Sequence, residues 1–212
     1  MLSTNRIAAL NADSGCSLLV AVKARRSGKS RLGAYLEPLQ RLGLVRRMLG
    51  HVLDAARDAR TIRQIIVVSP ERDMVPEDIP ILADAGLGLN KALCEAHRAL
   101  LALGTREWLI LPADLPRLAA ADIDALVEAG RIAGFAVAPD ASGSGTNGLY
   151  LSCAQCFDFQ FGPGSREHHV NAALRLGHRV AMVSRPGLEF DVDGPSELEQ
   201  WEPLCWQLPR LA

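Results

Sequence analysis

The stretch Leu109-Ile-Leu-Pro-Ala-Asp-Leu-Pro-Arg-Leu118 ends an apolar run abruptly and places one carboxylate, Asp114, just beyond it. A short, continuous apolar run is typical of a strand that is buried on both faces of a parallel sheet. In open sheets of this kind, ligands bind outside the carboxyl ends of the strands. We therefore expect Asp114 to lie close to a bound ligand.

Around this stretch, short apolar runs alternate with amphipathic segments of helical period. Strands are expected at 16–22, 65–68, 79–83 (a short edge strand interrupted by Pro80), 108–111, 135–138, 149–151 and 180–183. Helices are expected at 38–59, 92–103, 119–129 and 165–176, with a short one from Pro195. This alternation predicts repeated βαβ units, an α/β fold and a mostly parallel sheet. We expect a flexible tail over residues 1–15 and one domain over residues 16–212.

Composition limits the classes of partner. The chain has 212 residues, 49% of them apolar, and 23 basic against 24 acidic side chains, which gives a net charge of −1. This balance predicts no bulk attraction for nucleic acid or for an anionic membrane. Five cysteines in apolar surroundings suit free thiols, and the single Cys153-x-x-Cys156 pair lacks the second pair of a four-thiolate zinc site. No signal segment or bilayer-spanning run is evident, so we expect a cytoplasmic protein.

The densest positive charge lies at residues 23–32, Lys-Ala-Arg-Arg-Ser-Gly-Lys-Ser-Arg-Leu, directly after the first expected strand. Backbone amides and basic side chains at such a position can bind a triphosphate. Gly28-Lys29-Ser30 resembles the end of a Walker A loop, but Lys23 occupies the position where that motif needs glycine. An ordinary solvated loop is the alternative interpretation.

Three further features accompany this loop. Asp191 and Asp193 flank Val192, and two carboxylates on one side of an extended segment favour a cation beside them, although Asp193 could simply precede and cap a helix at Pro195. Two loops rich in small donors, 142–148 and 161–165, could cradle a phosphate or carboxylate, or could be plain turns. The Gly-rich turn ending at Asn90 could read the edge of a nucleobase or could cap a helix.

Three features together indicate metal-dependent transfer at a nucleoside triphosphate: a basic loop, an isolated Asp after a central strand and an Asp-x-Asp near the end of the chain. Carboxylates are the hard oxygen ligands that hold Mg²⁺ beside phosphate oxygens. The ion neutralises charge on the attacked phosphorus and on the departing pyrophosphate. We therefore predict a split metal site formed by Asp114, Asp191 and Asp193.

Six motifs in this order resemble those of the CofC/FbiD family, the guanylyltransferases of deazaflavin (coenzyme F-420) biosynthesis. They are Lys-x5-Lys-Ser-Arg-Leu at 23–32, Gly-Leu-Asn at 88–90, Pro-Ala-Asp-Leu-Pro at 112–116, Gly-Thr-Asn at 145–147, Phe-Gly-Pro-Gly-Ser at 161–165 and Asp-Val-Asp at 191–193. The resemblance implies a three-layer αβα, Rossmann-like fold of the MobA-like nucleotidyltransferase type. It also implies that GTP and 2-phospho-L-lactate, phosphoenolpyruvate or 3-phosphoglycerate condense to a guanosine diphospho-acid with release of pyrophosphate.

The resemblance assigns roles residue by residue. Lys23 and Asp114 match catalytic residues, and Asp114, Asp191 and Asp193 match the Mg²⁺ ligands. The nucleotide-binding residues are Lys23, Lys29, Ser30, Arg31 and Asn90, the last on the guanine side, and the acceptor-binding residues are Thr146, Gly162 and Ser165. A downstream transferase is the expected recipient of the product, and a homodimer is possible for this family.

Other interpretations remain open at this stage. Another nucleotidyltransferase of the same fold, acting on a molybdopterin or a sugar phosphate, usually has a Gly-rich loop where this chain has lysines. A non-catalytic nucleotide-binding regulator would have no turnover to lose. A nicotinamide dehydrogenase is disfavoured because no Gly-x-Gly-x-x-Gly follows the first strand. His169 could contact the acceptor acid, although a surface or packing histidine is the simpler interpretation.

Overall fold

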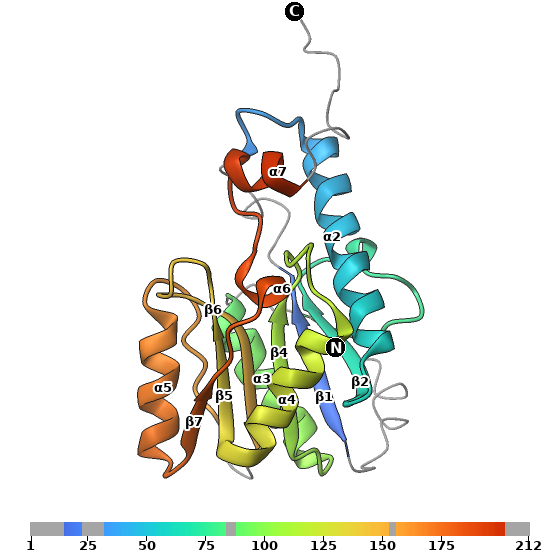
Figure 1. Cartoon of the computed structure of the whole chain (residues 1–212). Coiled ribbons are helices and arrows are strands. Elements are labelled where there is room, and N and C mark those ends of the chain that lie inside the picture. The colour runs from blue at the N-terminus through green and yellow to red at the C-terminus, as the bar shows by residue number, and fades with distance from the viewer. Residues whose placement is uncertain (1–14, 23–31, 84–87, 153–155, 202–212) are drawn as a thin grey trace, which may run out of the picture.

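The central strands of the predicted sheet are present and lie side by side. The computed structural model describes residues 15–22, 32–83, 88–152 and 156–201. β1 (Cys16–Ala21) pairs in parallel with β4 (Glu107–Pro112) in the middle of the sheet (Figure 1). All six residues of β1 are buried, which is why its sequence is continuously apolar instead of alternating.

The described strands form one seven-stranded sheet. Its order is β3 (Ile81–Ala83), β2 (Ile62–Ser69), β1, β4, β6 (Thr146–Ser152), β5 (Gly134–Pro139) and β7 (Arg179–Met182). Only β6 runs antiparallel to its neighbours among these strands. The connection from β5 to β6 is too short for a crossover, so those two strands must pair antiparallel. The prediction of a mostly parallel α/β sheet is confirmed.

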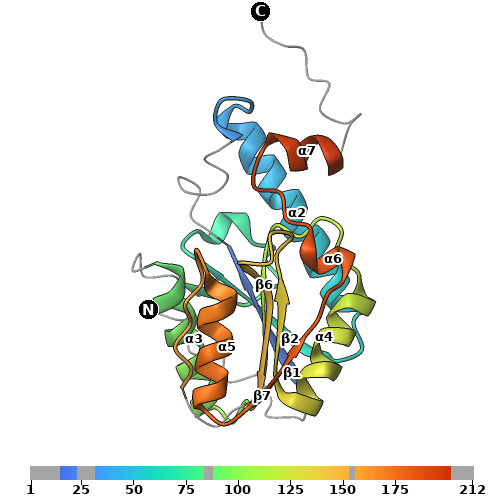
Figure 2. The ribbon, with the colours of Figure 1, turned by 60° about the vertical axis from the view of Figure 1, so that its left-hand side comes forward.

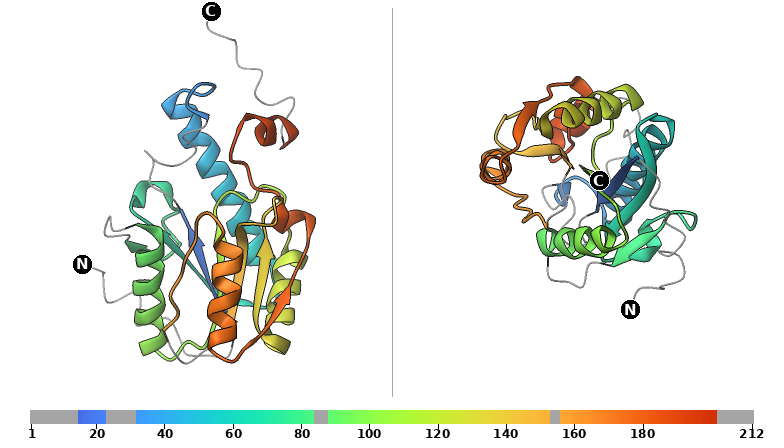
Figure 3. Two further views of the ribbon diagram at one scale, coloured as in Figure 1. Left: turned by 90° about the vertical axis from the view of Figure 1, so that its left-hand side faces the viewer. Right: turned by 90° about the horizontal axis from the view of Figure 1, so that it is seen from below.

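Helices cover both faces of the sheet and make three layers (Figures 2 and 3). α2 (Pro38–Asp58) and α4 (Ala120–Ala133) pack on one face with Leu18 and Val20 of β1. α3 (Leu89–Ala102) and α5 (Ser165–Arg175) pack on the other face with Leu19. Successive strand residues thus enter opposite cores, as the two-residue period of a strand requires.

The first half of α2 extends beyond the sheet, where α7 (Pro195–Trp201) lies against it (Figure 1). A third apolar cluster joins these helices; it consists of Leu32, Leu36, Leu44, Met48, Val192 and Leu198, with Phe190 and Trp201 packed against it. The cluster anchors the segment between α6 (Pro186–Glu189) and α7 above the carboxyl ends of the strands. This placement brings a late part of the chain back to the centre of the sheet.

Most element predictions are confirmed within about three residues, including the edge position of β3 and the helix that begins at Pro195. The short helices η2 (Arg72–Met74) and α6 were not predicted, because a single turn has no measurable period. The possible cap at Asn90 is wrong: Gly88, with φ +90°, is the residue before α3, and Asn90 lies in the first turn. Residues 1–14 of the predicted tail lie outside the described part of the chain.

The structure also bears on two expectations from the sequence, those on the cysteines and on membrane-spanning segments. Cys16, Cys94 and Cys156 are free thiols, whereas Cys153 of the C-x-x-C pair lies outside the described residues. Among the described helices, none has the length and apolarity needed to cross a bilayer.

Candidate active site

The carboxyl ends of the central parallel strands meet at one edge of the sheet. The backbone amide of Ala113 donates to the carbonyl of Ala21 over 3.1 Å, and the amide of Val22 donates to the carbonyl of Val68 over 2.9 Å. The ends of β1, β2 and β4 are therefore tied together. Val22 is also the residue that precedes Lys23 in the sequence.

Asp114 and the late Asp-x-Asp segment are brought together at this edge. The amide of Val192 donates to the backbone carbonyl of Asp114 over 3.2 Å. Val192 itself is fully buried in the third cluster, whereas Asp191 and Asp193 on either side of it are half-buried. The contact joins two segments that are far apart in the sequence, as the prediction of a split site requires.

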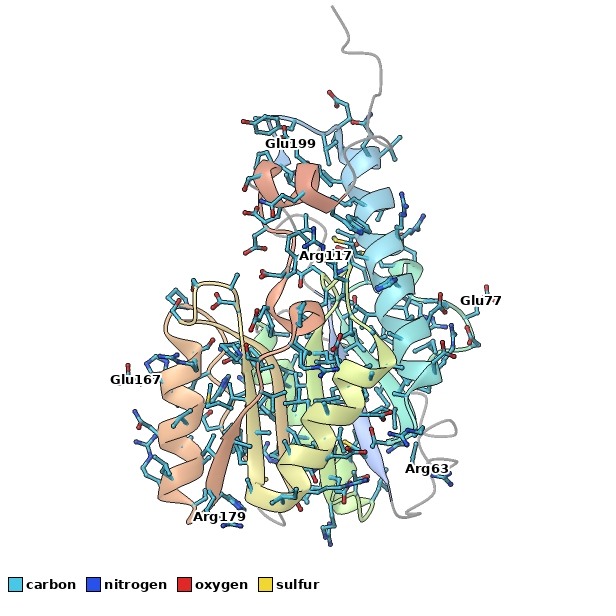
Figure 4. All side chains as sticks on the ribbon, viewed as in Figure 1. Arg63, Glu77, Arg117, Glu167, Arg179 and Glu199 are labelled. Atoms are coloured by element: carbon cyan, nitrogen blue, oxygen red, sulfur yellow. The ribbon has the colours of Figure 1, made fainter. Side chains whose placement is uncertain are left out.

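Arg117, which lies in the stretch of residues 109–118, holds residues 190–200 in place. Its guanidinium donates to the carbonyl of Gln200 over 3.0 Å and lies 3.7 Å from the centre of the Phe190 ring. Figure 4 labels Arg117 between the sheet and α7. An ion pair from Arg185 to Asp122, over 2.9 Å, fixes the start of α6 to the start of α4.

Asn147 orients one of the predicted metal ligands. Its side-chain amide donates to Asp191 Oδ1 over 3.1 Å and to the carbonyl of Glu189 over 3.4 Å. Asn147 is buried at the start of β6, so the hydrogen bond fixes one oxygen of a half-buried carboxylate. Asn147 belongs to the Gly-Thr-Asn motif at 145–147, but the motif predicted no role for it; the signal for such a role is an amide at a buried strand position.

The fit of these carboxylates to Mg²⁺ follows from their chemistry. No group of three or more His, Cys, Asp or Glu that could hold a metal ion occurs among the residues that the structure describes. Mg²⁺ does not need such a cage, because it is commonly bound by one or two carboxylates together with substrate phosphates and water. The juxtaposed segments of Asp114 and Asp191 supply carboxylates of this kind.

The two small-residue loops meet at the N-terminus of α5. The amide of Arg166 donates to the carbonyl of Ser144 over 3.2 Å, which ties the second loop to the first. The Asp140 carboxylate accepts hydrogen bonds from the amides of Ser144 and Gly145, which shapes the first loop. Thr146 and Ser165 are 7% and 2% exposed, so both lie just beneath the surface of this junction.

Gly162 needs a backbone conformation that side chains disfavour. Its φ is +134°, and a Cβ added there would meet open space. Glycine is therefore required by the backbone and not by crowding. The open space above Gly162 also leaves its backbone accessible, which suits a residue predicted to bind an acceptor.

His169 connects the same two loops from below. It is fully buried, its Nδ1 lies 3.1 Å from Thr146 Oγ1, and its Nε2 accepts a hydrogen bond from the amide of Gln160 over 3.1 Å. Burial, with a smaller contribution from the charge of His168, lowers the pKa of His169 to about 4. The structure thus places His169 in the interior and not on the helix surface.

Asn90 contacts the second loop. Its Oδ1 accepts from the amide of Phe161 over 2.7 Å, and its Nδ2 donates to the carbonyl of Phe161 over 3.0 Å. Within the described part of the chain, these bonds use one of the two N–H groups and one of the two lone pairs of the amide. Recognition of a guanine by Asn90 remains a prediction. The predicted triphosphate residues Lys23, Lys29, Ser30 and Arg31 lie outside the described part of the chain.

Comparison with known proteins identifies the family. The family model described as "Guanylyl transferase CofC like" matches residues 16–201. A phosphoenolpyruvate guanylyltransferase of Rubrobacter xylanophilus is 45% identical over 190 residues, covering 87% of this chain and 92% of that protein. The enzyme of the same name from Chloroflexus aurantiacus is 37% identical, covering 87% of this chain and 93% of that protein.

Solved structures of low sequence identity share the fold. A putative nucleotide-diphospho-sugar transferase from Desulfovibrio desulfuricans superposes with a TM-score of 0.71 at 16% identity, covering 94% of this chain and 92% of that chain. A nucleotidyl transferase from Methanothermobacter gives a TM-score of 0.62 at 18% identity, covering 89% of this chain and 96% of that chain. The predicted MobA-like nucleotidyltransferase fold is confirmed. The chain belongs to the CofC-like guanylyl transferase family, and it is an enzyme that transfers GMP in the biosynthesis of coenzyme F-420.

Proposed function

We propose that this guanylyltransferase uses phosphoenolpyruvate as its acceptor acid, with GTP as donor and pyrophosphate as the second product. The observation that carries the proposal is the name shared by the relatives described above, of which the most similar is 45% identical over nearly the whole chain. Of the three acids that the sequence motifs left open, only this one is named in those relatives.

The reaction needs no general base. A phosphate oxygen of the acceptor attacks the α-phosphorus of GTP, and the bond from that phosphorus to the oxygen bridging to the β-phosphate breaks. Because the second pKa of a phosphate monoester is about 6, the attacking group is mostly dianionic at neutral pH. Both fully buried histidines, His97 and His169, are neutral there because burial lowers their pKa values to about 4. The acceleration would come from positioning and electrostatics.

Asp114 and Asp191 are the residues that we propose hold Mg²⁺, with Asp193 beside them. Bound there, the ion would supply positive charge to the attacked phosphorus and to the departing pyrophosphate. The backbone contact between Asp114 and Val192 and the hydrogen bond from Asn147 to Asp191 support this assignment, because the first joins the two segments and the second fixes one oxygen of the Asp191 carboxylate. Lys23 and the Lys29–Arg31 stretch would neutralise the triphosphate.

Thr146, Gly162 and Ser165 are the residues that we propose bind the acceptor acid. Their hydroxyls and the loop backbone are donors, and donors are what a carboxylate or phosphate needs. Asn90 would contact the guanine side. We further propose a cytoplasmic enzyme that passes its guanosine diphospho-acid to a downstream transferase, with no role in binding nucleic acid; a homodimer remains a possibility to be measured.

A panel of acceptors tests the proposal. Purified protein is incubated with Mg²⁺, GTP and either phosphoenolpyruvate, 2-phospho-L-lactate or 3-phosphoglycerate, and pyrophosphate release is measured. The expected result is the highest kcat/KM with phosphoenolpyruvate. A higher kcat/KM with another acid would overturn the acceptor assignment. No release with any acid, under conditions where GTP binds, would overturn the proposed reaction.

A further inference from the structure

His169 is the point at which the two predicted acceptor loops are joined inside the protein. It lies on α5 and is fully buried, and both of its ring nitrogens have hydrogen-bonding partners. Nδ1 faces the Thr146 hydroxyl at the start of β6, and Nε2 faces the amide of Gln160, two residues before Gly162. One imidazole ring therefore touches both loops.

The partner of Nε2 fixes the tautomer of the ring. A backbone amide can only donate, so Nε2 must present its lone pair to the Gln160 N–H. The lowered pKa, about 4, means that the ring carries a single proton at neutral pH. That proton must be on Nδ1, from which it is donated to Thr146 Oγ1 over 3.1 Å.

This tautomer determines the direction of the Thr146 hydroxyl proton. Because Oγ1 accepts the hydrogen bond from His169, its own O–H cannot point at the ring and must donate elsewhere. Thr146 is 7% exposed and follows the loop whose Ser144 carbonyl is bound to the start of α5. A ligand at the junction of the two loops would meet a hydroxyl that is already set to donate.

We propose that His169 is a positioning residue for the acceptor acid: it orients the Thr146 hydroxyl as a donor to an anionic oxygen of the acceptor. The proposal rests on the proposed function for the identity of the acceptor and for the place of Thr146 in the acceptor site. His169 itself does not touch the ligand. It acts by removing the alternative in which Thr146 donates to the His169 ring and presents a lone pair to an anion.

The chain offers a matched control in His97. It is also fully buried, its pKa is also lowered to about 4 by burial, and it packs against Phe159, whose ring contacts the Phe157 ring beside His169. Its Nδ1 accepts a hydrogen bond from the amide of Phe157. Substitution of His97 should therefore cost similar packing without altering Thr146.

Two substitutions of His169 separate its two hydrogen bonds. In His169→Gln, the side-chain oxygen can still accept from the Gln160 amide, but the donor to Thr146 is lost. In His169→Asn, the side-chain nitrogen approximates Nδ1 and can still donate to Thr146. We expect KM for phosphoenolpyruvate to rise about 10-fold or more in His169→Gln and to be largely restored in His169→Asn, with KM for GTP within about twofold of wild type in both.

The controls make the outcome decisive. His97→Gln should leave both KM values unchanged, and adding His169→Gln to Thr146→Val should raise the acceptor KM no further, because the oriented hydroxyl is already absent. Equal increases in the KM for GTP and for phosphoenolpyruvate would show a merely structural role and overturn the proposal. So would an acceptor KM in His169→Gln equal to that of wild type.

A spectrum of the wild-type protein tests the tautomer without any activity. In a two-bond ¹H–¹⁵N correlation spectrum at pH 7, His169 should show the Nδ1-protonated pattern. An Nε2-protonated or doubly protonated ring would overturn the proposal even if the enzyme is active. If the protein releases pyrophosphate with none of the acids, the proposed reaction is overturned. The spectrum still tests whether His169 has the tautomer that orients Thr146.

Discussion

The Asn147 amide holds one oxygen of Asp191 through a hydrogen bond of 3.1 Å, and it is buried while the carboxylate is half-buried. A carboxylate that binds a metal gains from such a partner, because the hydrogen bond fixes its rotamer before the metal arrives. Asn147 would therefore set the position of Asp191 in the metal site that we propose for Asp114 and Asp191.

Replacement of Asn147 by alanine should weaken the response to Mg²⁺. We expect the Mg²⁺ concentration for half-maximal pyrophosphate release to rise by about 10–100-fold, because loss of a partner of a metal ligand typically has this effect. Asn171→Ala, at an exposed position on α5, is the control and should change nothing. An unchanged Mg²⁺ requirement in Asn147→Ala would show that Asp191 needs no help or binds no metal.

At the scale of residues, the sequence allowed charged candidates for the site to be selected, but not the neutral side chains that hold them. Asp114 could be selected because it follows a buried strand, and Asp191 and Asp193 because two carboxylates at this spacing lie on one side of an extended segment. Asn147 and His169 could not, because their partners depend on the register of β6 and on the depth of α5 beneath the loops. Neither property appears in local periodicity.

Among the secondary-structure elements, α7 and the segment before it depend on a few contacts with the loop after β4. Arg117 supplies two of them, to the Phe190 ring and to the carbonyl of Gln200. The apolar cluster around Val192, the backbone hydrogen bond from Val192 to Asp114 and the hydrogen bonds from Asn147 add to the attachment. Since an exposed cation–π contact contributes only about 0.5–1 kcal/mol, the segment should open locally more easily than the sheet.

Removal of the Arg117 guanidinium should make local opening of this segment more frequent. In Arg117→Ala, we expect faster hydrogen–deuterium exchange in peptides covering residues 188–201 and unchanged exchange in β5 and β6. Arg106→Ala is the matched control, because Arg106 binds only nearby carbonyls, those of Leu101 and Thr105, among the described residues. Slow exchange in residues 188–201 of Arg117→Ala would mean that the other contacts hold the segment without Arg117.

The kinds of element were predictable, but their order in the sheet was not. Apolar runs and helical periods identified strands and helices because burial on one or two faces leaves a repeating pattern. The insertion of β6 between β4 and β5 depends on pairing across the sheet, which local sequence does not encode. The short α6 was missed because the Pro186-Gly187 pair is equally typical of a turn.

For the molecule as a whole, the two buried histidines predict loss of stability in mild acid. Their pKa values are lowered to about 4 in the folded state, against about 6.5 when unfolded, so the unfolded chain binds more protons as the pH falls. The stability is complete above about pH 6.5 and is lost progressively as the pH falls towards 4. At pH 5 the lowered pKa of each histidine should reduce the free energy of unfolding by roughly 2 kcal/mol relative to neutral pH.

Urea unfolding at pH 7.5 and pH 5.0 measures this effect. The wild-type protein should lose several kcal/mol between the two conditions, and the double variant His97→Gln, His169→Gln should lose less, although it starts from a lower stability. An equal loss in the wild type and in the double variant would assign the acid sensitivity to other groups.

The central claim is that guanylyl transfer occurs where the loop after β4 meets the segment before α7. The most direct measurement is pyrophosphate release from GTP and phosphoenolpyruvate by Asp114→Ala, because this change removes the carboxylate while leaving the backbone carbonyl that accepts from Val192. We predict loss of turnover with an unchanged circular dichroism spectrum and melting behaviour. Turnover near the wild-type rate would show that the site lies elsewhere.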